Sequence, residues 1–219
     1  MGERRYSRFL TVLLIIIIIA VIGLAGYLGY DYYKNLKTSN DADQFVSTFV
    51  EEVDNNDNDT NENAGSIAEG VETADVSTKG GPRTSKGYNV IGTIEIPKTN
   101  VNYPILTGNS IGKMLEVAVV AIYPLNAEVN TPGNIVISGH NYRNSLFFSN
   151  NKKLANGDII YITDLNGDRV KYTIYSIFQT SVSDTGFYNR DTDGAKEITL
   201  STCTDASNDQ RLIVLARAE

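Results

Sequence analysis

Residues 197–203 read Glu197-Ile198-Thr199-Leu200-Ser201-Thr202-Cys203 and end at the only cysteine of the chain. Such alternation predicts a β-strand with Thr199, Ser201 and Cys203 on one face and the intervening residues on the other. A second β-like run follows at 211–216 and begins with Arg211. If the two strands are antiparallel neighbours, the loop 204–210 closes the turn and Arg211 lies beside Cys203.

Similar short runs, separated by turn residues, extend back to about Tyr88. They lie at 91–97, 102–106, 134–138, 158–163 and 170–177. Asn166-Gly167 between the last two runs predicts a β-hairpin. Segments 110–115 and 145–153 could form short helices. Roughly seven or eight strands with little helix predict an all-β domain, either a closed barrel or a sandwich.

An uncharged apolar stretch, residues 9–30, precedes this domain and includes seven consecutive Leu and Ile residues at 13–19. A helix of this length would measure about 33 Å, which matches the hydrocarbon core of a bilayer. The alternative is a cleaved signal peptide, which has a shorter apolar region followed by a small-residue cleavage site. No clear cleavage pattern precedes Asp31. The stretch is therefore predicted to be an uncleaved transmembrane anchor.

The charges around the anchor predict its orientation. Arg4, Arg5 and Arg8 precede the anchor with a single acid, Glu3. Lys and Arg residues stay on the cytoplasmic side of a membrane. We therefore expect a single-pass protein of the cell membrane, with residues 1–8 in the cytoplasm and the C-terminal part outside the cell.

The net charge of −7 belongs mainly to the segment after the anchor. Residues 31–85 hold twelve acids and four bases. Their Asn- and Asp-rich part has too little apolar content to fold, which predicts a solvated acidic linker. Apolar residues at helical spacing over 41–53 predict a short amphipathic helix within it. Residues 86–219 hold thirteen acids and twelve bases with no basic stripe, which argues against nucleic-acid binding.

Cys203 and His140 are the only cysteine and the only histidine of the chain. A lone cysteine outside the cell is a buried thiol, an intermolecular link or a nucleophile. A structural zinc site needs more Cys and His ligands than this chain offers. Both residues end predicted strands, where a rigid scaffold presents reactive groups. A cysteine attacks as its thiolate and needs a base or a cation nearby, which His140 and Arg211 could supply.

The segment Thr199-Leu200-Ser201-Thr202-Cys203 resembles the TLxTC signature of sortases at every specified position. Arg211 begins the following strand, where that family has its arginine. Gly139-His140 ends a strand roughly sixty residues before the cysteine, as the family's histidine does. Residues 92–97 resemble the family's opening strand, and residues 154–158 resemble the turn before a mid-domain strand. The similarity extends from about residue 88 to the end.

The resemblance implies a closed eight-stranded β-barrel over residues 86–219 and a two-step acyl transfer. We expect no cofactor and assign no metal-binding residue, and the sequence leaves any calcium requirement open. Cys203 would attack a C-terminal LPxTG-like sorting signal of a secreted protein and form a thioacyl-enzyme. An amine acceptor of a cell-wall precursor, or a protein lysine, would then resolve it. His140 would act as acid and base, and Arg211 would stabilise the oxyanion.

The remaining site residues follow from the same resemblance. Thr202 and Ser201 of the signature, and Tyr188 of the loop 187–190, would contact substrate. The group that orients His140 is left open. Three polar residues are candidates for this role: Asn141, Asp205 and Asp209.

Alternatives differ in acceptor and in chemistry. A cysteine peptidase would hydrolyse surface or cell-wall peptides, but papain-like cell-wall hydrolases place the cysteine before the histidine. A pilin-type ligase usually has a second membrane span and an aromatic lid motif, and we find neither in residues 31–219. Class B members of the family carry a long helix at the position of residues 181–196, which form only a short segment here. A single-protein anchoring enzyme is therefore favoured. A non-catalytic binding module would leave Cys203 inert.

Overall fold

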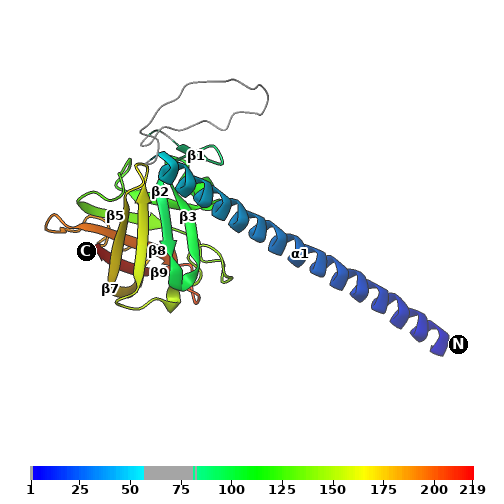
Figure 1. The fold of residues 1–219 in the computed structure, drawn as a ribbon. Coiled ribbons are helices and arrows are strands. Elements are labelled where there is room, and N and C mark those ends of the chain that lie inside the picture. Colours follow the sequence, from blue (N-terminus) through cyan, green and yellow to red (C-terminus); the bar gives the residue numbers. More distant parts are fainter. Residues whose placement is uncertain (1, 57–80, 82) are drawn as a thin grey trace, which may run out of the picture. The chain divides into compact units, whose positions relative to one another are not determined.

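The computed structural model describes residues 2–56, 81 and 83–219. Its β-strands form one sheet that closes on itself (Figure 1). The strands are β1 (Arg83–Ser85), β2 (Tyr88–Ile96), β3 (Val101–Thr107), β4 (Val119–Tyr123), β5 (Gly133–Ser138), β6 (Ile159–Asp164), β7 (Arg169–Ser181), β8 (Lys196–Cys203) and β9 (Gln210–Ala218). The order β2-β3-β4-β5-β8-β9-β7-β6 returns to β2, so the predicted eight-stranded barrel is confirmed.

Strand β2 closes the barrel because it pairs with three strands. One edge pairs with β3, and the other edge pairs first with β1 and then with β6. A register shift between Val90 and Gly92 marks this change of partner. Strand β1 is thus a short addition outside the closed ring.

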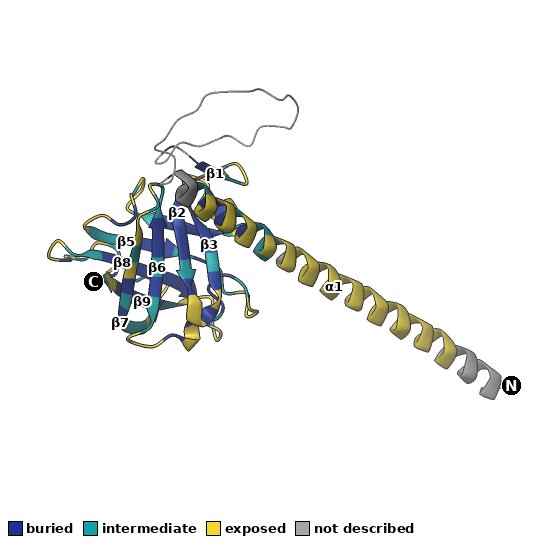
Figure 2. Ribbon diagram, in the orientation of Figure 1, coloured by how far each residue is buried: buried dark blue, intermediate teal, exposed yellow. Residues whose placement is uncertain are grey.

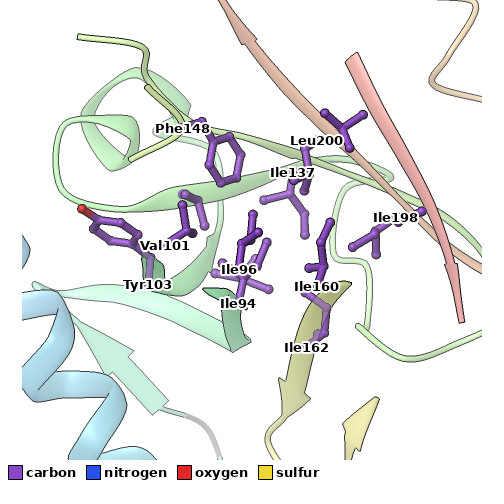
Figure 3. Packing of buried hydrophobic residues seen from close by; sticks show 14 of the residues in the cluster. Ile94, Ile96, Val101, Tyr103, Ile137, Phe148, Ile160, Ile162, Ile198 and Leu200 are labelled. Atoms are coloured by element: carbon purple, nitrogen blue, oxygen red, sulfur yellow. The ribbon is translucent and has the colours of Figure 1, made fainter. Parts of the chain in front are cut away.

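The barrel interior is filled by aliphatic and aromatic side chains. Ile94, Ile162 and Leu200 come from three different strands, and each is fully buried. Figure 3 shows how side chains from β2, β6 and β8 point toward one another. An eight-stranded barrel is just wide enough for its side chains to fill it. The interior is therefore a core that holds the strands, and chemistry must take place elsewhere.

Two strands that matter for the candidate site lie side by side although the chain separates them widely. β5 pairs with β8 in parallel, with Ser138 opposite Ser201. β8 in turn pairs with β9 in antiparallel fashion, with Cys203 opposite Arg211. The β6–β7 hairpin predicted from Asn166-Gly167 is also present.

The N-terminal helix α1 (Gly2–Asn56) is continuous over 55 residues. Among the described residues it is the one helix long and apolar enough to cross a membrane, judged by length and composition. Residues 10–34 are exposed throughout, as the colouring of α1 in Figure 2 shows. The helix predicted at 41–53 is the last part of α1 and no separate element. Within the predicted linker, residues 57–80 and 82 lie outside the described residues. Residues 31–56 belong to α1 and residues 83–85 form β1, so these parts are not the solvated coil that the composition predicted.

The last part of α1 belongs to the same compact unit as the barrel, residues 41–219. Its predicted apolar face is partly confirmed, because Val46 and Phe49 are buried while Val50 is 37% exposed. Nη1 of Arg83 donates a hydrogen bond to Oε2 of Glu52 at 2.7 Å, and Cζ of Arg83 lies 4.5 Å from the centre of the Phe49 ring. These contacts join the last part of α1 to β1.

Two strands were not predicted from the sequence. β4 is an apolar run without alternation, and β1 is only three residues long. The predicted helix at 110–115 corresponds to α2 (Ile111–Leu115). The one predicted at 145–153 is reduced to a single 3-10 turn, η2 (Asn151–Lys153). A second 3-10 turn, η1 (Pro97–Thr99), follows β2.

Gly92 is required where the barrel closes. A Cβ atom at this position would lie 2.5 Å from the backbone oxygen of Thr163 and 3.0 Å from Cγ2 of Val129. Overpacking of this kind costs about 1–3 kcal/mol. We expect Gly92→Ala to lower the free energy of unfolding of the full-length chain in detergent by that amount, measured by denaturant titration.

Gly112 provides the matched control, because a Cβ atom there meets nothing within 4 Å. Gly112→Ala should therefore leave the stability unchanged or raise it slightly. Equal effects of the two substitutions would contradict the assignment of Gly92 to a crowded closure.

Candidate active site

Cys203 is the last residue of β8, and its side chain is partly accessible. Nη1 of Arg211, the directly opposite residue on β9, lies 3.2 Å from Sγ of Cys203. The same nitrogen donates to the carbonyl of Asn208 at 2.8 Å, which holds the guanidinium in the turn between the strands. The predicted contact between Arg211 and Cys203 is therefore confirmed. A cation in this position stabilises negative charge on the sulfur or on a nearby oxygen.

His140 is brought to the same end of the barrel by the parallel pair β5–β8. Gly139 extends this pairing by donating its N–H to the carbonyl of Ser201 at 3.2 Å. One residue further along, Nδ2 of Asn141 donates to the carbonyl of Cys203 at 2.9 Å. His140 lies between these two contacts. The segment that carries the histidine is thus fastened to the strand that carries the cysteine.

A carboxylate that the sequence did not indicate lies beside His140. Oε1 of Glu116 lies 3.3 Å from Nε2 of His140, which is within ion-pair distance. This nitrogen is buried, and no group among the described residues, Glu116 included, forms a hydrogen bond with it. The hydroxyl of Tyr142 donates to the other oxygen of Glu116 at 3.1 Å, and its ring centroid is 4.7 Å from that of His140. Glu116 follows the short helix α2, and no motif or spacing distinguishes it.

Of the three residues predicted as partners of His140, two contact each other. Nδ2 of Asn141 donates to Oδ1 of Asp205 at 2.9 Å, and Lys152 forms an ion pair with the same carboxylate. Asp209 contacts its own loop, since its N–H bonds to Ser207. Asn141 and Asp205 therefore join the histidine loop to the loop after Cys203.

The predicted substrate contacts at Thr202 and Ser201 remain predictions, and both residues are only 3% exposed. The hydroxyl of Thr202 donates to the carbonyl of Gly139 at 2.7 Å, which is a further bond between β8 and the histidine segment. In the described arrangement Thr202 and Ser201 are therefore buried beneath the surface of the site.

Tyr188 lies in the loop between β7 and β8, against the outer face of the barrel. Its ring meets that of Tyr123 edge to face, with centroids 5.4 Å apart. The neighbouring Phe187 is buried against Val136 of β5 and Leu215 of β9. Val136 and Leu215 both pair with Thr199 of β8. The loop therefore covers the outer face of the strand that ends at Cys203.

Comparisons with known proteins identify the family of the barrel domain. The family model for the sortase domain matches residues 94–219. The chain belongs to the sortase family. Among curated proteins, no sequence matches it.

Solved sortase structures of several classes are similar to the barrel. A Clostridium perfringens sortase D5 transpeptidase is 37% identical, with a TM-score of 0.52, covering 59% of this chain and 79% of that one. Sortase C-1 from Actinomyces oris is 28% identical, with a TM-score of 0.54, covering 59% and 73%. Listeria monocytogenes sortase A is 26% identical, with a TM-score of 0.52, covering 59% and 87%. The protein is therefore a sortase-type cysteine transpeptidase, and its subclass stays open.

Asp205, in the loop after Cys203, contacts both Asn141 of the histidine loop and Lys152. Hydrogen bonds from Lys152 and then from Asn141 hold the pKa of Asp205 below its ordinary value of 3.8. The carboxylate therefore contributes stability that is complete above that value and is lost as the pH falls through the lower folded-state pKa. We expect an NMR titration of the Asp205 carboxyl to give a pKa below 3.8 and Lys152→Met to raise it. An unchanged pKa in Lys152→Met would contradict the ion pair.

Proposed function

We propose that this sortase cleaves a C-terminal LPxTG-like sorting signal through a thioacyl-enzyme on Cys203 and joins the protein to a cell-wall amine. The observation that carries the proposal is the 3.2 Å contact between Nη1 of Arg211 and Sγ of Cys203, at the strand end next to His140. A thiolate, a proton carrier and a fixed cation are the groups that acyl transfer from a peptide bond needs.

In the first step the Cys203 thiolate attacks the carbonyl carbon of the Thr–Gly-type bond. Negative charge develops on the carbonyl oxygen, and the guanidinium of Arg211 stabilises it. The C–N bond then breaks, and protonated His140 gives its proton to the departing amine. The thioester remains on Cys203, and the C-terminal fragment leaves.

In the second step an amine attacks the thioester carbonyl. His140 takes a proton from the incoming nitrogen, the C–S bond breaks, and the thiolate of Cys203 is restored. Glu116 and Tyr142 orient the imidazole through both steps, which is supported by their contacts with His140 and with each other. Water in place of the amine would make the enzyme a peptidase, and a protein lysine would make it a pilin-type ligase.

The catalytic roles predict which products form. The full-length enzyme in detergent, incubated with a library of sorting-signal peptides, should give a thioester adduct at Cys203 by mass spectrometry. An added amine should convert this adduct into an amide product. Because only one cysteine is present, Cys203→Ala should abolish the adduct. An adduct that water hydrolyses at the same rate with and without amine would favour the peptidase.

The other two groups should each have a measurable effect on the rate. Removing a general acid–base costs about 10²–10⁴-fold, so we expect His140→Ala to lower kcat/KM by that range. Removing an oxyanion donor costs about 10²–10³-fold, which is the expectation for Arg211→Ala. Wild-type rates in either variant would remove that residue from the mechanism.

We also propose that the anchor holds the catalytic domain outside the cell. One apolar N-terminal helix is compatible with a membrane anchor, and sortases are cell-surface enzymes. In a Cys203→Ala background, a cysteine at exposed Lys153 should react with a membrane-impermeant maleimide on intact cells. A cysteine at Ser7 should react only after permeabilisation. The reverse pattern would invert the topology.

A further inference from the structure

Glu116 is an accessible carboxylate at the edge of the site, and it lacks a cationic side chain of its own. Its side chain is 57% exposed, and Oε1 lies 3.3 Å from Nε2 of His140. Among the described residues no lysine or arginine forms an ion pair with Glu116, not even Lys113 one turn earlier in α2. The carboxylates of Asp158 and Asp205, by contrast, each pair with a lysine. A negative charge next to His140 is therefore available to a ligand.

The two oxygens of Glu116 are used differently. Oε2 accepts a hydrogen bond from the hydroxyl of Tyr142 at 3.1 Å, which fixes the orientation of the carboxylate. Oε1 accepts no hydrogen bond within the described part of the chain, although it faces the buried Nε2 of His140. A carboxylate offers about four acceptor positions, so Oε1 keeps its capacity for a further N–H donor. A donor bound there would lie next to the nitrogen of His140.

The chemistry of this position suits a primary ammonium ion. A carboxylate forms its strongest hydrogen bonds with charged N–H donors. An ammonium group carries three such donors, and amines of the α-amino or lysine type are mostly protonated at neutral pH. The guanidinium of Arg211 contacts Cys203, where negative charge develops on the peptide carbonyl, whereas Glu116 contacts His140. The site therefore separates its charges, with a cation for the acyl group and an anion for the amine.

We propose that Glu116 binds the acceptor amine as a primary ammonium ion and holds it beside His140 for the second step. This inference rests on the proposed transpeptidation. It adds to that reaction the residue that binds the acceptor and the charged form in which the acceptor arrives.

The proton balance of the second step fits this arrangement. The bound ammonium has three protons, and the amide nitrogen of the product keeps one. The first proton leaves to water, which reaches the amine because Glu116 is exposed. The free lone pair then attacks the thioester carbon and forms the C–N bond. His140, neutral after the first step, takes the second proton, and the C–S bond breaks to restore the thiolate of Cys203.

Two nucleophiles of different charge test the role of Glu116. The amino group of glycine amide is mostly protonated at neutral pH, whereas hydroxylamine is largely uncharged. Glu116→Gln removes the charge and keeps an oxygen that can accept from Tyr142. With the full-length enzyme in detergent and a sorting peptide that forms the thioester, we measure kcat/KM for each nucleophile. We expect the ratio of glycine amide to hydroxylamine to fall about three- to fivefold in Glu116→Gln, the size of effect that an exposed ion pair supports.

The ratio separates binding of the amine from orientation of the histidine, because a misplaced imidazole slows both nucleophiles alike. Glu128→Gln is the matched control for net charge. Glu128 is exposed and precedes the start of β5, whereas His140 follows the end of that strand. The ratio should stay at the wild-type value in this control. Added salt should raise KM for glycine amide in the wild type more than in Glu116→Gln, because salt screens exposed charges.

Three results would overturn the inference. These are an unchanged ratio in Glu116→Gln, an equal fall of the ratio in Glu128→Gln, and a wild-type thioester that hydroxylamine resolves but glycine amide does not. If the wild-type enzyme forms no thioester with any peptide, the proposed function fails first, which is a distinct outcome.

Discussion

The parallel pairing of β5 with β8 is the constraint on which the candidate site depends. Ser138 and Ser201 are 63 positions apart in the chain, yet they lie directly opposite each other in the sheet. A parallel pair needs a long crossover between its strands, and here that crossover contains β6 and β7. Because the barrel is closed, neither strand can slide without disturbing all its neighbours. Two residues beyond the paired serines, the chain presents His140 on one strand end and Cys203 on the other.

Polar contacts continue this pairing beyond the ends of the strands. Thr202 donates to the carbonyl of Gly139, and Asn141 donates to the carbonyl of Cys203. These bonds cross between the two segments in both directions. At the opposite end of β8 a second polar group, centred on Glu197 and Asn134, fastens the loop that carries Tyr188. A single strand therefore connects the nucleophile with the polar contacts that fasten the loop carrying Tyr188.

Both faces of β8 are buried for different reasons, and this explains its sequence. Ile198 and Leu200 point into the barrel core, as the alternation predicted. Thr199 and Ser201 point outward, but the loop containing Phe187 covers that face. Small hydroxyl residues suit this position because they leave room for the loop and can bond to Asn134 or to neighbouring backbone. The signature thus reflects packing as much as chemistry.

The sequence by itself determined the strands with clear alternation, the β6–β7 hairpin, the apolar helix and the contact between Arg211 and Cys203, because each depends on residues close together in the chain. It did not indicate β4, whose apolar run lacks a period, or the continuity of α1 through residues 31–40. Only the tertiary structure decided that Glu116 lies beside His140 and that Arg190 meets Glu197 and Asn134. Such partners are chosen by strand register and barrel closure, which are properties of the whole sheet and leave no local pattern in the sequence.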